Sequence, residues 1–212
     1  MSEPRHPHRM RIVLCSLTGF ANAIIPALIR LGHRPCVVTR RERGPFPHYE
    51  CPNVLTLVED YQLPFRFDLD QQTVERCDLL LVATFHQIIP PTLYRLARHA
   101  VNLHPSLLPK YRGPNPFHWV LANGENETGI TAHALSERCD TGDIYAQWRL
   151  PILPYETEGI LRRRLAELAA FAATEIVSTI ERAVLVGSPQ DEALATYYPH
   201  PMVNGSLEKQ NG

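Results

Sequence analysis

The side chains best suited to chemistry are an asparagine and a histidine near the end of one predicted strand, and an aspartate in a later loop. Asn102 and His104 stand two residues apart in the segment 100–104, so a strand presents both on one face. An amide N–H and an imidazolium together can stabilise an oxyanion. A carboxylate such as Asp140 can hold the histidine cationic and accept a proton. Brought together, these three side chains suit acyl transfer.

Each member of this set also has a purely structural interpretation. Asn102 and His104 can form a hydrogen-bonded pair in the core, because buried polar side chains need partners. Asp140 is followed by Thr141 and Gly142, and an aspartate beside such a turn is often a surface residue. The two interpretations differ in whether the fold brings Asp140 to His104. Acyl transfer needs no serine or cysteine nucleophile here if the substrate supplies its own amine.

Other kinds of site find little support in the sequence. The turn after the first predicted strand lacks G-x-G-x-x-G, and neither a P-loop, a G-x-S-x-G elbow nor an H-E-x-x-H motif occurs. The five cysteines are widely spaced without a C-x-x-C pair, so we expect neither a metal site nor a disulfide scaffold. Dinucleotide binding, triphosphate binding and zinc chemistry are therefore disfavoured.

The elements that must position these residues alternate between strand and helix in the first half of the chain. Apolar and β-branched segments predict strands at residues 11–17, 36–39, 65–67, 78–84, 100–104, 128–134 and 144–150. Helical composition, with its caps and breakers, predicts helices at residues 20–31, 54–61, 90–96, 116–123 and 158–183. This order predicts an α/β fold: a doubly wound, mostly parallel sheet with an antiparallel extension and a long C-terminal helix. Ligands of such sheets bind beyond the carboxyl ends of the strands, where Asn102 and His104 stand.

Length and composition set the domain organisation. The chain has 212 residues, 44% of them hydrophobic, and a formal net charge of −1, which disfavours disorder and a dedicated polyanion binder. We expect a flexible N-terminus at 1–10, one catalytic domain at 11–189 and a tail at 190–212. Neither a signal-peptide core nor a membrane-spanning apolar run is present, so the expected location is cytoplasmic, without a membrane partner.

Five short pieces of the sequence resemble the folate-dependent formyltransferase family. They are Asn-Leu-His-Pro-Ser-Leu-Leu-Pro at 102–109, Tyr-Arg-Gly at 111–113, Thr-Gly-Ile-Thr at 128–131, Asp-Thr-Gly-Asp-Ile at 140–144 and Ile-Ile-Pro at 88–90. The resemblance implies a Rossmann-like formyltransferase fold and a catalytic role for Asn102, His104 and Asp140. It also implies 10-formyltetrahydrofolate as co-substrate and formyl donor. A substrate amine would attack the formyl carbon, with Asn102 and protonated His104 on the oxyanion and Asp140 taking the proton.

The resemblance also places a folate pocket between two loops, whose main-chain groups would hold the pterin. The implied cofactor-binding residues are Phe85, Gln87, Ile88, Ile89, Leu135, Arg138, Cys139, Asp140 and Asp143. Ile88, Ile89 and Leu135 would supply its apolar walls. His86 and Gln87 depart from the family's usual turn, so their contacts are not implied.

The acceptor amine has three candidates within the family. We place a small-molecule amine first, such as an amino-sugar nucleotide or a specialised-metabolite amine, because amino-sugar nucleotide formyltransferases have the Tyr-Arg-Gly form and accept a small-molecule amine. The Tyr-Tyr-Pro tail at 197–199 resembles a piece that follows the catalytic domain in both the sugar and the tRNA enzymes, which share the Tyr-Arg-Gly form. Glycinamide ribonucleotide is second, because the first strand lacks the usual phosphate loop. Methionyl-tRNA is third, because the charge balance does not suit tRNA and the chain ends before the further basic domain of those enzymes. The candidate acceptor-binding residues are Ser16, Leu17, Thr18, Pro105, Ser106 and Tyr111.

Two other classes stay open. A formyltetrahydrofolate hydrolase would use water in place of the amine, although that family carries an N-terminal regulatory domain that this chain lacks. A non-catalytic folate-binding module inside an assembly is the other. Nucleic acid is not expected as a partner, and a homodimer is compatible with the resemblance.

Overall fold

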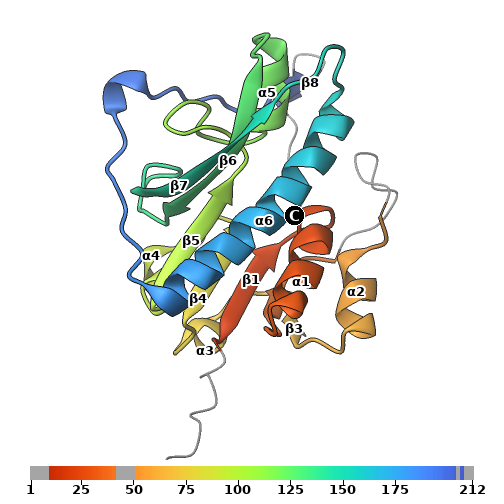
Figure 1. Cartoon of the computed structure of the whole chain (residues 1–212), viewed down its shortest axis with the longest axis vertical. Helices are drawn as coiled ribbons and strands as arrows, with labels where there is room; N and C mark the ends of the chain where they lie inside the picture. The colour runs from red at the N-terminus through yellow and green to blue at the C-terminus, as the bar shows by residue number, and fades with distance from the viewer. Residues whose placement is uncertain (1–9, 42–50, 204–205, 208–212) are drawn as a thin grey trace, which may run out of the picture.

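The computed structural model describes residues 10–41, 51–203 and 206–207. Most of the N-terminal segment 1–10 and of the proline-rich loop at 40–53 lies outside the described residues. Within them, seven strands form one mixed sheet in the order β3-β2-β1-β4-β5-β6-β7 (Figure 1). The strands are β1 (Ile12–Ser16), β2 (Cys36–Val38), β3 (Phe65–Arg66), β4 (Leu79–Ala83), β5 (His99–His104), β6 (Glu127–Ala134) and β7 (Ile144–Pro151).

The pairing of the strands confirms the predicted fold class. The first five strands of the chain run parallel, and β6 and β7 extend the sheet antiparallel beyond β5. A separate two-stranded hairpin joins β8 (Met202–Val203) and β9 (Ser206–Leu207). The helices are α1 (Phe20–Arg30), α2 (Val54–Asp60), α3 (Gln71–Val74), α4 (Pro91–Tyr94), α5 (Pro116–Ala122) and α6 (Glu158–Arg182), with a 3₁₀ turn at Glu192–Leu194.

Both faces of the central strands are covered. Alternate residues of β1 belong to two different hydrophobic clusters, Ile12 and Leu14 to one and Val13 and Cys15 to the other. The first cluster lies under α1 and α6, which pack side by side across one face of the sheet (Figure 1). This explains why β4 is a continuous apolar run and β1 is apolar up to Ser16, since a strand covered on both faces has no polar side.

Small residues allow α6 to lie close to the sheet and to α1. Four buried alanines follow its inner face: Ala166, Ala169, Ala172 and Ala173. The helix begins at the capping residue Thr157, whose hydroxyl accepts a hydrogen bond from the backbone N–H of Ile160 at 3.3 Å. Thus α6 closes one face of the core, while the loops at the carboxyl ends of the strands are left to form the site.

Three short elements were not expected from the sequence: α3, the 3₁₀ turn and the β8–β9 hairpin. They are too short to show a hydrophobic period. The helix α3 has only four residues, and it begins where the Asp70 carboxylate accepts a hydrogen bond from the backbone N–H of Thr73 at 2.7 Å.

Candidate active site

The strand β5 carries two polar side chains to the edge of the sheet where the parallel strands end. It pairs with β4 on one side and with antiparallel β6 on the other, which sets Asn102 opposite His133 and His104 opposite Thr131. Asn102 is half-buried, and His104 is only 4% exposed. The predicted common face is therefore present, at the predicted edge.

The aspartate meets the pair from the loop between β6 and β7. The Asp140 Oδ1 atom lies 3.5 Å from the Asn102 Nδ2, 3.5 Å from the His104 Nδ1 and 3.6 Å from the His133 Nε2. Its Oδ2 atom accepts a hydrogen bond from the backbone N–H of Gly113 at 2.9 Å. The fold thus assembles the amide, the imidazole and the carboxylate, and the surface-turn interpretation of Asp140 does not describe this structure.

The loop reaches the site through an unusual backbone. Asp140 has a φ of 58°, in the left-handed region that residues with a Cβ seldom adopt. Two residues later the loop requires a glycine, Gly142, because a Cβ at this position would collide with the carbonyl oxygen of Ala134. Strain of this kind persists only where the surrounding contacts hold it, and it clusters at functional sites.

The electrostatics of the site favour an ionised Asp140 carboxylate, whereas opposing effects act on the His104 imidazole. Burial acts to raise the pKa of Asp140, but the two histidines and the Gly113 amide outweigh it and hold that pKa well below its usual range. Burial lowers the pKa of His104, although Asp140 opposes this. The two ring nitrogens of His104 face the Tyr111 carbonyl and the Asp140 carboxylate, so its protonated form would have an acceptor on each side.

Hydrogen-bond partners fix the two imidazole tautomers. The His104 Nε2 faces the carbonyl oxygen of Tyr111 at 2.8 Å, so it carries a proton and donates it. The His133 Nδ1 likewise donates to the carbonyl oxygen of Ala134 at 2.8 Å. This leaves the His133 Nε2 to accept from the Asn102 Nδ2 at 3.1 Å, which orients the amide.

Sequence reasoning missed His133. The signal available was its spacing, because His133 follows Thr131 by two residues and so shares its face of the strand. Only the antiparallel register of β5 and β6, however, sets it beside Asn102. The backbone N–H of Gly113 was missed too, since no side-chain pattern reports a main-chain donor.

A stability test follows from Gly113, whose φ is 97° and where a Cβ would collide with the carbonyl oxygen of Tyr198. We expect Gly113→Ala to lower the free energy of unfolding by about 2 kcal/mol, from strain plus the displaced tail. The matched control is Gly124→Ala, because Gly124 has a φ of 67° with nothing within 4 Å of the added Cβ. Urea denaturation compares the two variants, and equal losses would contradict the clash.

The expected folate loops lie after β4 and after β6. Ile89 belongs to one hydrophobic cluster, and Phe85 and Leu135 pack against that cluster. Ile88 is 79% exposed and stands apart from that cluster. Four other expected residues of these loops are exposed: Gln87, Arg138, Cys139 and Asp143. The second loop is braced internally, with the Ser136 hydroxyl donating to the carbonyl oxygen of Arg138 at 2.8 Å.

The expected acceptor residues have internal partners for most of their polar groups. The Ser16 hydroxyl donates to the carbonyl of Ala83, and the Thr18 hydroxyl accepts from the backbone of Val54. The Ser106 hydroxyl donates to the carbonyl of Lys110. Of the remaining three residues, Leu17 is half-buried and Pro105 is buried. Tyr111 is also buried, and its hydroxyl donates a hydrogen bond to the Glu125 carboxylate at 2.6 Å. Their acceptor role stays a prediction.

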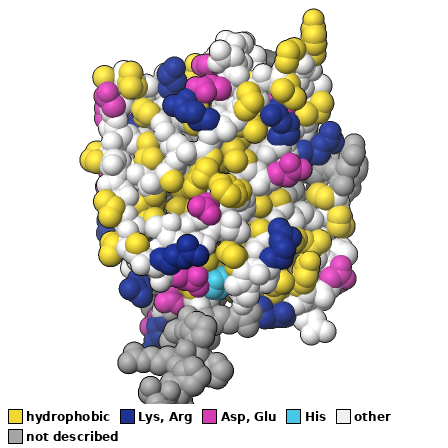
Figure 2. All heavy atoms as spheres, in the orientation of Figure 1, with side chains coloured by type: hydrophobic (Ala, Val, Ile, Leu, Met, Phe, Trp, Pro, Cys, Tyr) yellow, Lys and Arg dark blue, Asp and Glu magenta, His cyan; other side chains and the backbone are white. Residues whose placement is uncertain are grey.

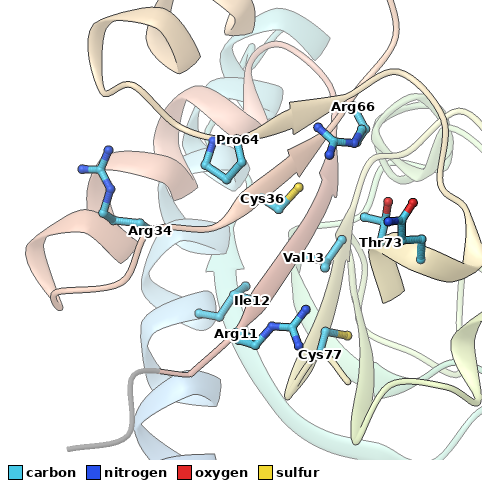
Figure 3. Close-up of a pocket in the computed structure, with 10 residues that line it drawn as sticks. Arg11, Ile12, Val13, Arg34, Cys36, Pro64, Arg66, Thr73 and Cys77 are labelled. Carbon is cyan, nitrogen blue, oxygen red and sulfur yellow. The ribbon is translucent and has the colours of Figure 1, made fainter. Parts of the chain in front are cut away.

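A cavity of about 380 Å³ lies elsewhere, by the amino ends of the parallel strands (Figure 3). Arg11, Arg34 and Arg66 line it together with two cysteines, Cys36 and Cys77. None of the candidate site residues lines it.

In the described part of the chain, no group of three or more His, Cys, Asp or Glu side chains is arranged to hold a metal ion. Among the described helices, none is both long and apolar enough to span a membrane.

Fold and site together define a doubly wound α/β protein with an Asn–His–Asp arrangement at the carboxyl edge of its sheet. Its sequence matches the formyl transferase family model over residues 67–177. The chain therefore belongs to the formyl transferase family, which confirms the resemblance.

Named relatives agree with this family. The methionyl-tRNA formyltransferase of Geobacter sulfurreducens is 34% identical over 215 residues, covering 96% of this chain and 66% of that protein. The enzyme of the same name from Moorella thermoacetica is 37% identical over 202 residues, covering 90% of this chain and 65% of the other. This chain thus spans about two thirds of the length of these curated relatives.

Solved structures share the fold at lower identity. The sugar 3N-formyl transferase WlaRD superposes with a TM-score of 0.78 at 19% identity, covering 91% of this chain and 70% of the other. Glycinamide ribonucleotide transformylase 1 of Symbiobacterium toebii gives 0.70 at 22% identity, covering 87% of this chain and 95% of the other.

Proposed function

We propose that this chain transfers a formyl group from 10-formyltetrahydrofolate to the primary amine of an acceptor. The observation that carries the proposal is the ionised Asp140 carboxylate, placed 3.5 Å from both the Asn102 amide and the His104 ring at the carboxyl edge of the sheet. Membership of the formyl transferase family supports it. A folate donor is supported by two structural neighbours: WlaRD was solved in the presence of 5-N-formyl-THF, and HypX of Aquifex aeolicus in complex with tetrahydrofolic acid.

The three side chains divide the work of the transfer. The amine nitrogen attacks the formyl carbon, and the Asn102 Nδ2–H, oriented by His133, donates to the oxygen as negative charge develops there. The Asp140 carboxylate takes the proton that the amine loses. As the bond from the formyl carbon to the donor nitrogen breaks, that proton passes to the leaving nitrogen.

In this proposal His104 acts through Asp140 and does not contact the reacting atoms. It is 4% exposed and both ring nitrogens face acceptors, the Tyr111 carbonyl and the Asp140 carboxylate. A proton on the Nδ1 would face the Asp140 carboxylate and support its negative charge during the transfer. This role differs from the direct oxyanion contact that the sequence suggested for His104.

The residues around the carboxyl edge fit a bound pterin. The apolar cluster of Ile89, against which Phe85 and Leu135 pack, lies at the two loops whose main-chain groups would hold the pterin. The exposed side chains of Gln87, Arg138, Cys139 and Asp143 flank those loops, and Ile88 would cover the ligand from outside. In this arrangement the donor's formyl group would be presented to Asn102 and Asp140.

For the acceptor we propose a small-molecule amine first. The second candidate is methionyl-tRNA, which the sequence relatives favour. Those relatives are named methionyl-tRNA formyltransferases, so a tRNA acceptor is to be tested rather than set aside. The support for a small molecule is electrostatic: the net charge is −1. On the face shown in Figure 2, Lys and Arg are also interspersed with acidic and apolar side chains instead of gathering in one patch.

The first experiment measures tetrahydrofolate release from 10-formyltetrahydrofolate, without amine and then with amino-sugar nucleotides, glycinamide ribonucleotide or methionyl-tRNA. Release that depends on one amine supports the transferase and identifies its acceptor. Release without amine would instead indicate a formyltetrahydrofolate hydrolase, and folate binding without release would indicate a binding module.

The residue test is His104→Ala. We expect kcat to fall by about 100-fold while folate affinity stays unchanged, because the ring supports Asp140 without reaching the ligand. Steady-state kinetics and folate titration on one preparation give both values. Unchanged turnover would overturn the catalytic assignment of this site.

A further inference from the structure

The segment after α6 is tied to the loop after β5 by a buried arginine. Arg112 is 7% exposed, and its guanidinium donates to two side chains of that segment. The Nε and Nη2 atoms donate to the Gln190 Oε1 at 3.1 and 2.8 Å, and Nη1 and Nη2 donate to the Glu192 carboxylate at 3.0 and 2.8 Å. The backbones pair as well, from the Arg112 N–H to the Thr196 carbonyl and from the Tyr198 N–H to the Arg112 carbonyl.

This arrangement fixes the orientation of the Gln190 amide. A guanidinium has only donors, so the oxygen of the amide must face it. The nitrogen then points away, and it donates to the carbonyl oxygens of Asp140 and Gly142, each at 2.8 Å. Both hydrogens of the amide are used. Gln190 thus connects Arg112 to the backbone on either side of Thr141.

The same two loops meet at the carboxylate. The Gly113 N–H, next to Arg112, donates to the Asp140 Oδ2 at 2.9 Å. Asp140 itself has a left-handed φ of 58°, a conformation that is uncommon for residues with a Cβ although aspartate tolerates it better than most. Two links, one through Gly113 and one through Gln190, therefore clamp Asp140 by its side chain and by its main chain.

We propose that Gln190 is a positioning residue that holds the Asp140 carboxylate against Asn102 and His104. The proposal rests on the proposed function, because it assigns Asp140 to the formyl transfer. It gives part of the predicted tail at 190–212 a role in the reaction. Gln190 does not touch the substrate; it acts through the backbone carbonyls of Asp140 and Gly142.

Two variants and a matched control test this. Gln190→Glu keeps an oxygen for Arg112 but cannot donate to the two carbonyls, and Gln190→Leu removes both contacts without adding charge. The control is Glu192→Leu, which removes the other partner of Arg112 and leaves the bonds from Gln190 to the Asp140 loop in place. Thermal unfolding confirms that each variant is folded under assay conditions.

We expect both Gln190 variants to lower kcat by about 10- to 100-fold with the KM for the formyl donor unchanged, since small misplacements of a reacting group have effects of this size. Glu192→Leu is expected to keep the wild-type kcat. A wild-type kcat in both Gln190 variants, or an equal loss in the control, would overturn the proposal.

A second readout does not depend on turnover. Asp140 raises the proton affinity of His104, so a displaced carboxylate shifts the His104 titration to lower pH. NMR titration of the histidine rings should show this shift in Gln190→Leu and not in Glu192→Leu; an unshifted His104 in Gln190→Leu would overturn the proposal. If wild-type protein transfers no formyl group to any amine, the proposed function fails, while this titration still decides whether Gln190 positions Asp140.

Discussion

Replacing Asp140 by asparagine is expected to lower kcat by on the order of 1,000- to 10,000-fold, the upper part of the range for a general base. The substitution keeps the volume of the side chain, and its oxygen can still accept from the Gly113 N–H. It removes the negative charge that faces the Asn102 amide and the His104 ring. The amine then has no group to take its proton. Single-turnover rates with the identified acceptor measure the change directly.

Folate affinity separates this chemical loss from a structural one. We expect Asp140→Asn to bind folate with an affinity near that of the wild type, because its backbone contacts stay in place. The matched control is Glu137→Gln in the same loop, where the exposed Glu137 forms a surface ion pair with Arg95. A variant Asp140→Asn that turns over at the rate of Glu137→Gln would show that the carboxylate is not the base.

The fold was predictable because its signals are local. The long helix predicted at 158–183 is observed at Glu158–Arg182, since its apolar period and its Thr157 cap are both written in adjacent residues. The apolar run at 78–84 becomes the buried strand Leu79–Ala83 for the same reason. The elements that escaped prediction, such as Gln71–Val74, are single turns whose existence depends on one capping contact.

The site was predictable only in its side-chain identities. Asn102 and His104 share a face because side chains alternate along a strand. No pattern in the residues near Asp140, however, predicts that its loop folds back to meet them. His133 requires the register of β5 and β6, and Gln190 requires a contact between segments far apart in the sequence. The burial that acts to lower the pKa of His104 is likewise a property of the folded chain, which the sequence does not show.

The second large effect is expected at Asn102, which the register of β5 and β6 sets opposite His133. We expect Asn102→Asp to lower kcat by on the order of 1,000-fold, above the loss for an oxyanion donor alone. The new carboxylate would stand where the amide nitrogen lies 3.5 Å from the Asp140 Oδ1. Two like charges at that distance repel by about 5 kcal/mol at an effective dielectric constant near 20. One of the two acids is then protonated near pH 7, so the variant loses the donor and weakens the base together.

Comparison with Asn102→Ala isolates the charge effect, because alanine removes the donor and adds no carboxylate. Its expected loss is about 100-fold, and its kcat should keep the pH dependence of the wild type. For Asn102→Asp the kcat should instead rise with pH through the neutral range, as the shared proton leaves the pair. The control Asn126→Asp adds the same charge at an exposed position and should leave kcat unchanged. Asn102→Asp and Asn102→Ala could instead lose the same activity and show the same pH profile. A charge at position 102 would then have no effect on Asp140, and the close amide–carboxylate pair would not be the reacting geometry.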